Sequence, residues 1–142
     1  MVPEIVPEKR EAEPILVHLA NKTFHLLIYN EKLYIPTHEG LALIGVELNW
    51  LCFEKNSRRG KLLKRQKFSF KEILLCYETG IRGKYVFVEA YSYEDFLIIW
   101  SYFASKGNSR ALRVLMWLAQ FGLNQYLKPW GDTDGMVSSV CD

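Results

Sequence analysis

The sequence predicts an α+β fold, with a small antiparallel sheet made of hairpins, a helix-turn-helix-like pair and a C-terminal helical hairpin. Three patterns indicate this fold. Aromatic and β-branched residues flank turn signals near residues 30 and 80. Apolar residues recur at helical spacing on both sides of Gly45, and two long apolar stretches with helix-capping residues follow residue 91. With 142 residues, of which 49% are hydrophobic, the chain is long enough for one domain with its own core.

We expect four segments along the chain. Residues 1–14 contain three prolines and four glutamates, a composition typical of a flexible arm. Residues 15–91 are predicted to form the mixed α/β module with the helix-turn-helix-like pair and a basic segment. Residues 92–128 are predicted to form the helical hairpin, and residues 129–142 a polar tail.

The predicted sheet begins with a hairpin. Thr23–Tyr29 is rich in β-branched and aromatic residues, Asn30-Glu31 is a plausible turn, and Lys32–Ile35 returns. Pro36 should end the second strand because it has no N–H to donate to a ladder. Tyr85–Tyr91 is predicted as a further strand after a Gly-containing turn, whereas Glu72–Tyr77 fits either a helix or a strand.

The helix-turn-helix-like pair is predicted over residues 37–52. Thr37 is a good N-cap, and Gly45 suits a left-handed helix end. The two helices would meet through a Gly-containing turn, which is typical of a helix-turn-helix. Two packed helices in a core would show the same pattern, so both interpretations stay open. The expected buried residues are Leu41, Leu43 and Ile44 in the first helix and Leu48, Leu51 and Cys52 in the second.

A strongly basic segment, residues 54–67, follows this pair. It holds seven of the 18 basic residues of the chain and one acid, Glu54. Such a run is often only a solvated surface, but clustered Lys and Arg also supply most non-specific affinity for DNA. The bases are Lys55, Arg58, Arg59, Lys61, Lys64, Arg65 and Lys67. Base edges would be read from the start of the second helix by Glu47 and Asn49, while Trp50 is more typical of a packing residue.

The C-terminal helices carry a second signal. Ser92 and Asp95 form a predicted capping box, Lys106-Gly107 should end the first helix, and Asn108 or Ser109 should cap the second. Because both helices are apolar around most of their circumference, they must be buried on more than one side. We therefore expect self-association, most simply as a homodimer; coverage by the N-terminal sheet is the alternative. The residues expected to pair subunits are Trp100, Phe103, Leu115, Trp117, Leu118 and Phe121.

No cofactor, metal site or catalytic residue is predicted. The three histidines lack ligand spacing with the cysteines, and no hydrolase or phosphate-binding motif occurs. Glu89 near Lys84 faintly resembles a metal-dependent nuclease core, which would need Glu72 or Glu78 as a second carboxylate. The three scattered cysteines, together with the lack of a signal peptide or an apolar span, indicate a cytoplasmic protein that does not enter a membrane.

A resemblance rests on short motifs of the C-terminal region. These are an x-S-x-E-D helix start, a KGN-x-x-A junction (Lys106, Gly107, Asn108, Ala111) and a long apolar helix. The region resembles that of a group of phage and cyanobacterial proteins similar to phage antirepressors, in which it follows a module with a helix, G-V, helix corner. Here Leu41–Leu51 provides that corner in the same order. The resemblance implies a regulatory, DNA-associated role.

The sequence thus favours a regulator of transcription of phage or bacterial origin that binds double-stranded DNA. Two alternatives remain. One is an inhibitor that binds a host protein through its apolar helices. The other is a small metal-dependent endonuclease that uses Glu89.

Overall fold

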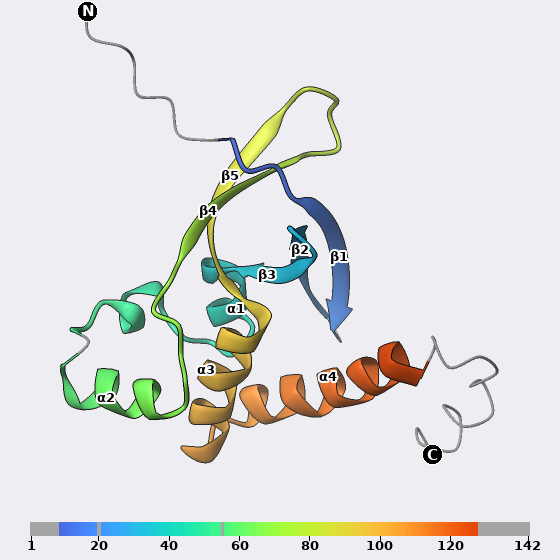
Figure 1. Ribbon diagram of the computed structural model, residues 1–142. Coiled ribbons are helices and arrows are strands. Elements are labelled where there is room, and N and C mark those ends of the chain that lie inside the picture. Colours follow the sequence, from blue (N-terminus) through green and yellow to red (C-terminus); the bar gives the residue numbers. More distant parts are fainter. Residues whose placement is uncertain (1–8, 20, 55, 128–142) are drawn as a thin grey trace, which may run out of the picture.

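The structure is a computed structural model that describes residues 9–19, 21–54 and 56–127 (Figure 1). The described residues form an α+β fold, as predicted. The strands are β1 (Glu13–Leu19), β2 (Lys22–Tyr29), β3 (Lys32–Pro36), β4 (Ile73–Glu78) and β5 (Tyr85–Ser92). The helices are α1 (Thr37–Ala42), the 3₁₀ turn η1 (Leu48–Leu51), α2 (Arg58–Arg65), α3 (Tyr93–Ser105) and α4 (Ser109–Leu127).

The strands form one antiparallel sheet in the order β1-β2-β3-β5-β4. The predicted β2–β3 hairpin is confirmed, and Asn30 and Glu31 both have positive φ, as a two-residue type I′ turn requires. β3 ends at Pro36, as predicted. The segment Glu72–Tyr77, which fitted either a helix or a strand, forms most of strand β4. The segment before β1 reaches the far edge of the sheet, where the amide of Ala12 donates to the carbonyl of Cys76 at 2.7 Å.

Each face of the sheet has its own apolar cluster. Phe24, Leu26 and Ile35 face the helices and pack in the main core with residues of α1, α2, α3 and α4. Leu27, Leu75 and Ala90 point to the other face and form a smaller cluster. This division follows from the alternation of side chains along each strand.

The predicted pair around Gly45 forms in part. Leu41, Leu43 and Ile44 are buried, and Gly45 has φ +73°, as expected for a left-handed helix end. Thr37 does not cap α1, because it is buried and its hydroxyl donates to Glu72 at 2.5 Å. The second element is a single 3₁₀ turn and not an α-helix.

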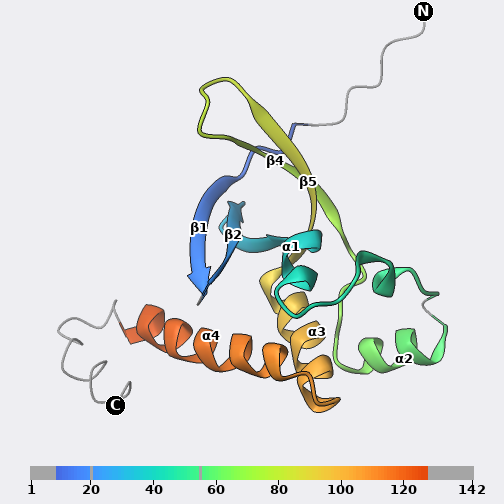
Figure 2. The ribbon, with the colours of Figure 1, turned by 180° about the vertical axis from the view of Figure 1, so that it is seen from behind.

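α3 and α4 follow each other in the C-terminal region, with α2 and α4 on opposite sides of α3 (Figures 1 and 2). The Ser92 side chain accepts from the amide of Asp95 at 3.1 Å, which is half of the predicted capping box. The buried Asp95 carboxylate binds Ser69 instead, through its amide at 2.9 Å and its hydroxyl at 2.5 Å. Asn108 caps α4 by accepting from the amide of Ala111.

Candidate nucleic-acid interface

The basic segment forms a short amphipathic helix, α2. Ser57 is its N-cap and accepts from the amide of Gly60 at 3.1 Å. Gly60 and Leu63 are buried against the body of the protein. Arg58, Lys61 and Arg65 are spaced i, i+3 and i+7, so they share the face of the helix turned away from Leu63, and all three are exposed.

The charge of this face is not neutralised within the described part of the chain. No carboxylate there forms an ion pair with a base of α2. Lys64, in the last turn of α2, and Lys67, just after the helix, are also exposed. Arg58 lies in the first turn, where the helix dipole disfavours a cation by about 0.3–1 kcal/mol. The same dipole favours Lys64 and Arg65 in the last turn. The exposed cations, which have no ion-pair partner in the described chain, are available to a partner.

Arg59 differs from the other bases of α2 because it is half-buried and packs on Trp50, although it also lines the hollow beside α2. Its Nη1 donates to the carbonyl of Trp50 at 2.8 Å, and its guanidinium lies 4.7 Å from the centre of the Trp50 ring. Trp50 also stacks with Phe53 and Tyr102, so it is a packing residue. Arg59 thus fixes α2 to the η1 segment, although it was expected among the DNA-binding bases. Lys55, another of those bases, lies outside the described residues.

The residues expected to read bases are not on a recognition helix. Asn49 is exposed on the single turn η1, and Glu47 precedes it in an extended conformation. A recognition helix must present several side chains along a groove, and a four-residue 3₁₀ turn cannot do so. The exposed bases of α2 lie on a longer helix and are the better candidates for contact with nucleic acid.

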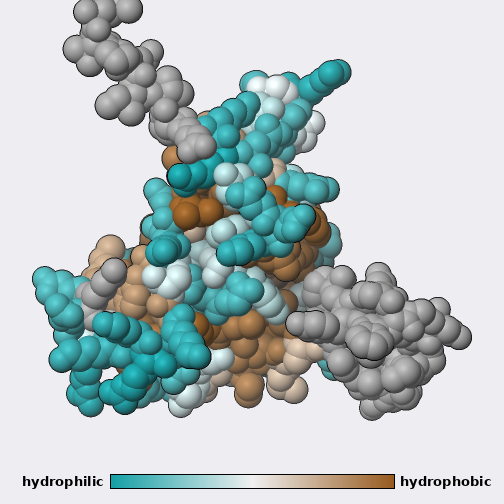
Figure 3. All heavy atoms as spheres, in the orientation of Figure 1, coloured by the Kyte–Doolittle hydropathy of each residue, from teal (hydrophilic) through white to brown (hydrophobic). Residues whose placement is uncertain are grey.

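An open groove separates α2 from α3. It consists of two adjoining hollows of about 420 and 770 Å³ that share Leu62, Tyr102 and Lys106. Leu97 and Ile98 add an apolar wall to the smaller hollow, and Arg58 and Arg65 line the larger one. Figure 3 shows hydrophilic residues gathered over α2 at the lower left, beside a hydrophobic area in the lower centre. The groove therefore combines apolar, aromatic and cationic side chains.

The residues expected to pair subunits differ in their burial. Trp100 and Leu118 are 0% and 2% exposed because they belong to the core of the chain itself, so they cannot line an interface. Phe103, Leu115 and Trp117 are half-buried, and the side chain of Phe121 lies outside those described. Among the described side chains of α4, residues 109–120, the large apolar ones that are exposed are instead Leu112 and Met116, at 50% and 62%. The N-terminal sheet covers the helices in part, through Val17, Phe24 and Leu26.

The carboxylates considered for a nuclease come together in part. Glu72 and Glu89 line one hollow of about 280 Å³ with Thr37, His38 and Tyr91. Burial and the neighbouring carboxylates, first Glu72, raise the pKa of Tyr91 to about 12, so this phenol stays protonated near neutral pH. Among the described residues, no three His, Cys, Asp or Glu side chains are arranged to hold a metal ion.

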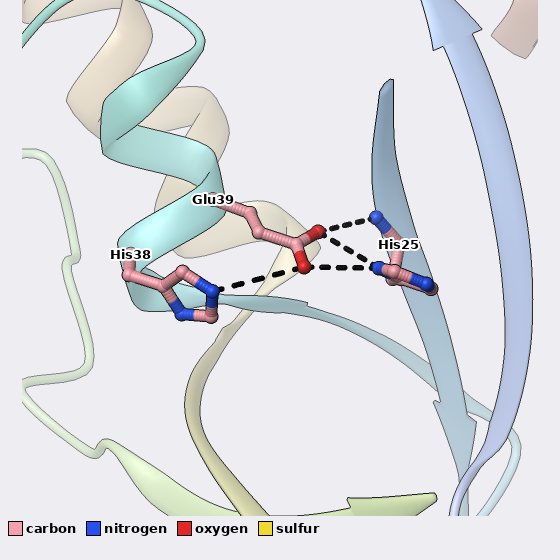
Figure 4. Close-up of polar contacts among 3 residues, drawn as sticks. All are labelled: His25, His38 and Glu39. Carbon is pink, nitrogen blue, oxygen red and sulfur yellow. Dashed lines mark hydrogen bonds and ion pairs between the residues drawn. The ribbon is translucent and has the colours of Figure 1, made fainter. Parts of the chain in front are cut away.

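Two of the three histidines, His25 and His38, have structural contacts. Figure 4 shows Glu39 of α1 between His25 and His38. Its carboxylate accepts from the backbone amide of His25 at 2.6 Å and lies 2.9 Å from Nδ1 of the same residue. His38 Nε2 is 3.8 Å away. His25 also packs on Tyr77, with ring centres 5.1 Å apart, so this cluster attaches α1 to β2.

Lys106 and Tyr102 line the groove beside α2, a role that the sequence did not indicate. Both follow α2 by some 40 positions, and α3 is apolar enough that Tyr102 reads as one more core residue. One signal did indicate that the basic segment is a helix. Ser57 is a good N-cap, and the apolar Leu62 and Leu63 follow within the next two turns.

The comparisons with known proteins give no relative. No family model, no curated protein and no solved structure matches the chain. Within the described residues, no helix is both long and apolar enough to cross a membrane.

Proposed function

We propose that this protein is a regulator of transcription, of phage or bacterial origin, that binds double-stranded DNA in the cytoplasm through α2. One observation carries the proposal: Arg58, Lys61 and Arg65 share the outward face of a capped helix, without an ion-pair partner in the described chain. Cations displayed in this way contact successive phosphates and release counterions from DNA. Lys64 and Lys67 extend the same surface.

The resemblance to antirepressor-like proteins supports this proposal through the KGN-x-x-A junction. Asn108 of that junction caps α4 and its Nδ2 donates to the carbonyl of Ile44 at 3.0 Å, which joins the C-terminal helix to the corner after α1. We further propose that α4 pairs two copies of the chain. Leu112 and Met116 are spaced i, i+4 on its exposed side, and two DNA-binding surfaces related by a two-fold axis suit a regulator.

Fluorescence anisotropy with a labelled duplex at two salt concentrations tests the role of α2. We expect the affinity of the wild type to fall steeply with salt. The triple variant Arg58→Ala/Lys61→Ala/Arg65→Ala should have a slope of log K against log salt that is shallower by about two to three units, at ~0.9 per lost phosphate contact.

A charge-matched control is Lys32→Ala/Arg82→Ala/Lys84→Ala, which removes three exposed cations, one from β3 and two from the β4–β5 turn. Its salt slope should equal that of the wild type. Failure of the wild type to bind any duplex at low salt would show that the proposed function is wrong, and equal slopes for the two triple variants would exclude α2 as the contact.

A second candidate function, a metal-dependent endonuclease, is favoured by the shared hollow of Glu72 and Glu89. It requires nicking of the duplex in the presence of Mg²⁺ that Glu89→Ala abolishes. Adding Mg²⁺ to the binding assay and separating the DNA on a gel distinguishes the two functions, because a regulator leaves the duplex intact.

A further inference from the structure

The groove beside α2 has a composition that phosphate binding alone does not require. Leu62, Leu97 and Ile98 give it an apolar wall, and the half-buried Tyr102 lines both of its hollows. Its two adjoining hollows have volumes of about 420 and 770 Å³ and are open at the surface of the protein.

Cations lie on both sides of this apolar and aromatic surface. Arg58 and Arg65 of α2 line one side, and Lys106 after α3 lines the other, with its Nζ 5.8 Å from the centre of the Tyr102 ring. A ligand that fits must combine a flat apolar part with flanking negative charges. A nucleobase between two phosphates has this chemistry, because bases stack on aromatic rings while the backbone binds Lys and Arg.

An intact duplex cannot use the groove in this way. Its bases are stacked and paired, and they present only their edges in the major and minor grooves. An unpaired base can leave the stack and enter a protein pocket at a modest energetic cost. The arrangement therefore distinguishes DNA with unpaired nucleotides from fully paired DNA.

We propose that the groove between α2 and α3 holds an unpaired nucleobase, stacked on Tyr102, of the same DNA whose phosphates contact α2. This inference rests on the proposed function and names its substrate class: DNA with single-stranded nucleotides beside a duplex, such as a bulge, gap or junction. Lys106 then neutralises the phosphate on the α3 side of the inserted base.

The experiment compares two probes of one sequence, an intact duplex and the same duplex with a short bulge that contains 2-aminopurine. We expect the bulged probe to bind about ten-fold more tightly, in line with the contribution of one base stacked on an aromatic ring. The 2-aminopurine fluorescence should be quenched on binding to the wild type. Lys106→Ala should weaken binding of the bulged probe only.

Tyr102→Ala should abolish the preference for the bulge, measured as the ratio of the two affinities, because the ring also packs on Trp50 beside α2 and its loss can change both affinities. Tyr102→Phe should keep the preference because the ring remains. Tyr85→Ala, in β5 and outside the groove, is the matched control and should behave as the wild type. Circular dichroism of each variant verifies folding, and the quenching of 2-aminopurine by the wild type tests the stacking independently of any variant.

Equal affinity of the wild type for both probes, or an unquenched bulge, would overturn the inference. That result would leave duplex binding by α2 standing, and it is also expected if an acidic protein segment occupies the groove instead. Absence of binding to either probe at low salt would contradict both this inference and the proposed function.

Discussion

Gly40 shows how a single missing side chain positions two helices. It is buried in α1 at the contact with α3, where a Cβ would lie 2.3 Å from Cε1 of Phe96. Its carbonyl accepts from Nε1 of the fully buried Trp100 at 3.0 Å. The close approach that brings these aromatic rings against α1 therefore depends on glycine at this position.

Gly40→Ala should lower the free energy of unfolding by about 1–3 kcal/mol, because the added methyl group forces Phe96 or the helix to move in a packed core. Urea denaturation measures the change. Gly80→Ala is the control, since no atom lies within 4 Å of the added Cβ; its effect should stay within about 0.5 kcal/mol. Equal stability of the two variants would contradict the tight contact.

The hydrogen-bond partners of two polar residues could not be predicted from the sequence, and one cause explains both. Asp95 was expected to complete a local capping box, and Arg59 was expected to contact DNA. Their actual partners, Ser69 and Trp50, are 26 and nine positions away. Composition and spacing identify such residues as polar and positioned near a helix, but the partner of a buried polar group depends on tertiary packing.

At the level of elements, local signals were enough where the backbone itself is constrained. The β2–β3 hairpin depends on two turn residues with positive φ, and the Gly45 corner depends on one. The second helix of the expected pair is a single 3₁₀ turn with no fully buried residue: Trp50 and Leu51 pack partly on the core, and Leu48, expected to be buried, is 56% exposed. Conversely, the basic segment forms a helix, since Ser57 caps it and Leu63 fixes its inner side.

The junction between α3 and α4 gives a prediction at this scale. Asn108→Ala removes both the cap of α4 and the bond to the carbonyl of Ile44. It should cost about 1–2 kcal/mol, as the loss of an N-cap does. Asn108→Asp keeps the oxygen that caps α4 but not the donor to Ile44. Its free energy of unfolding, measured by urea denaturation, should therefore fall by less than that of Asn108→Ala.

Ser109→Ala is the neighbouring control for this junction. Ser109 is exposed at the start of α4, so Ser109→Ala should change the free energy of unfolding by no more than about 0.5 kcal/mol. If Asn108→Ala were as stable as Ser109→Ala, the junction would not hold the two helices and the corner together.

For the whole molecule, the α+β class could be predicted because hydrophobic periodicity distinguishes strands from helices. Which apolar residues of α3 and α4 are buried in the core and which are exposed could not be predicted. Periodicity shows that Trp100, Leu118 and Met116 lie on apolar stripes, but only the packing of the sheet shows that the first two are in the core and the third is 62% exposed. The candidate interface could be predicted only in part. The basic residues of α2 are evident in the sequence, whereas the groove beside them depends on how α2 packs against α3.

Sedimentation equilibrium tests the proposed pairing of two copies. The wild type should be a dimer at micromolar concentration, and Leu112→Glu/Met116→Glu should be a monomer because it places four charges in the interface of the dimer. Ile81→Glu is the control at an exposed apolar residue in the β4–β5 turn and should remain a dimer. A stable wild-type monomer at micromolar concentration would exclude the pairing.

The contact between residues 10–12 and β4 has a consequence for association in general. The amide and the carbonyl of Cys76 are both occupied, by the carbonyl of Arg10 at 2.9 Å and the amide of Ala12 at 2.7 Å. The free edge of β4 is thus interrupted in its middle, and it cannot act as a continuous template onto which a strand of another chain adds. The fold thereby hinders the addition of a strand at the β4 edge of the sheet.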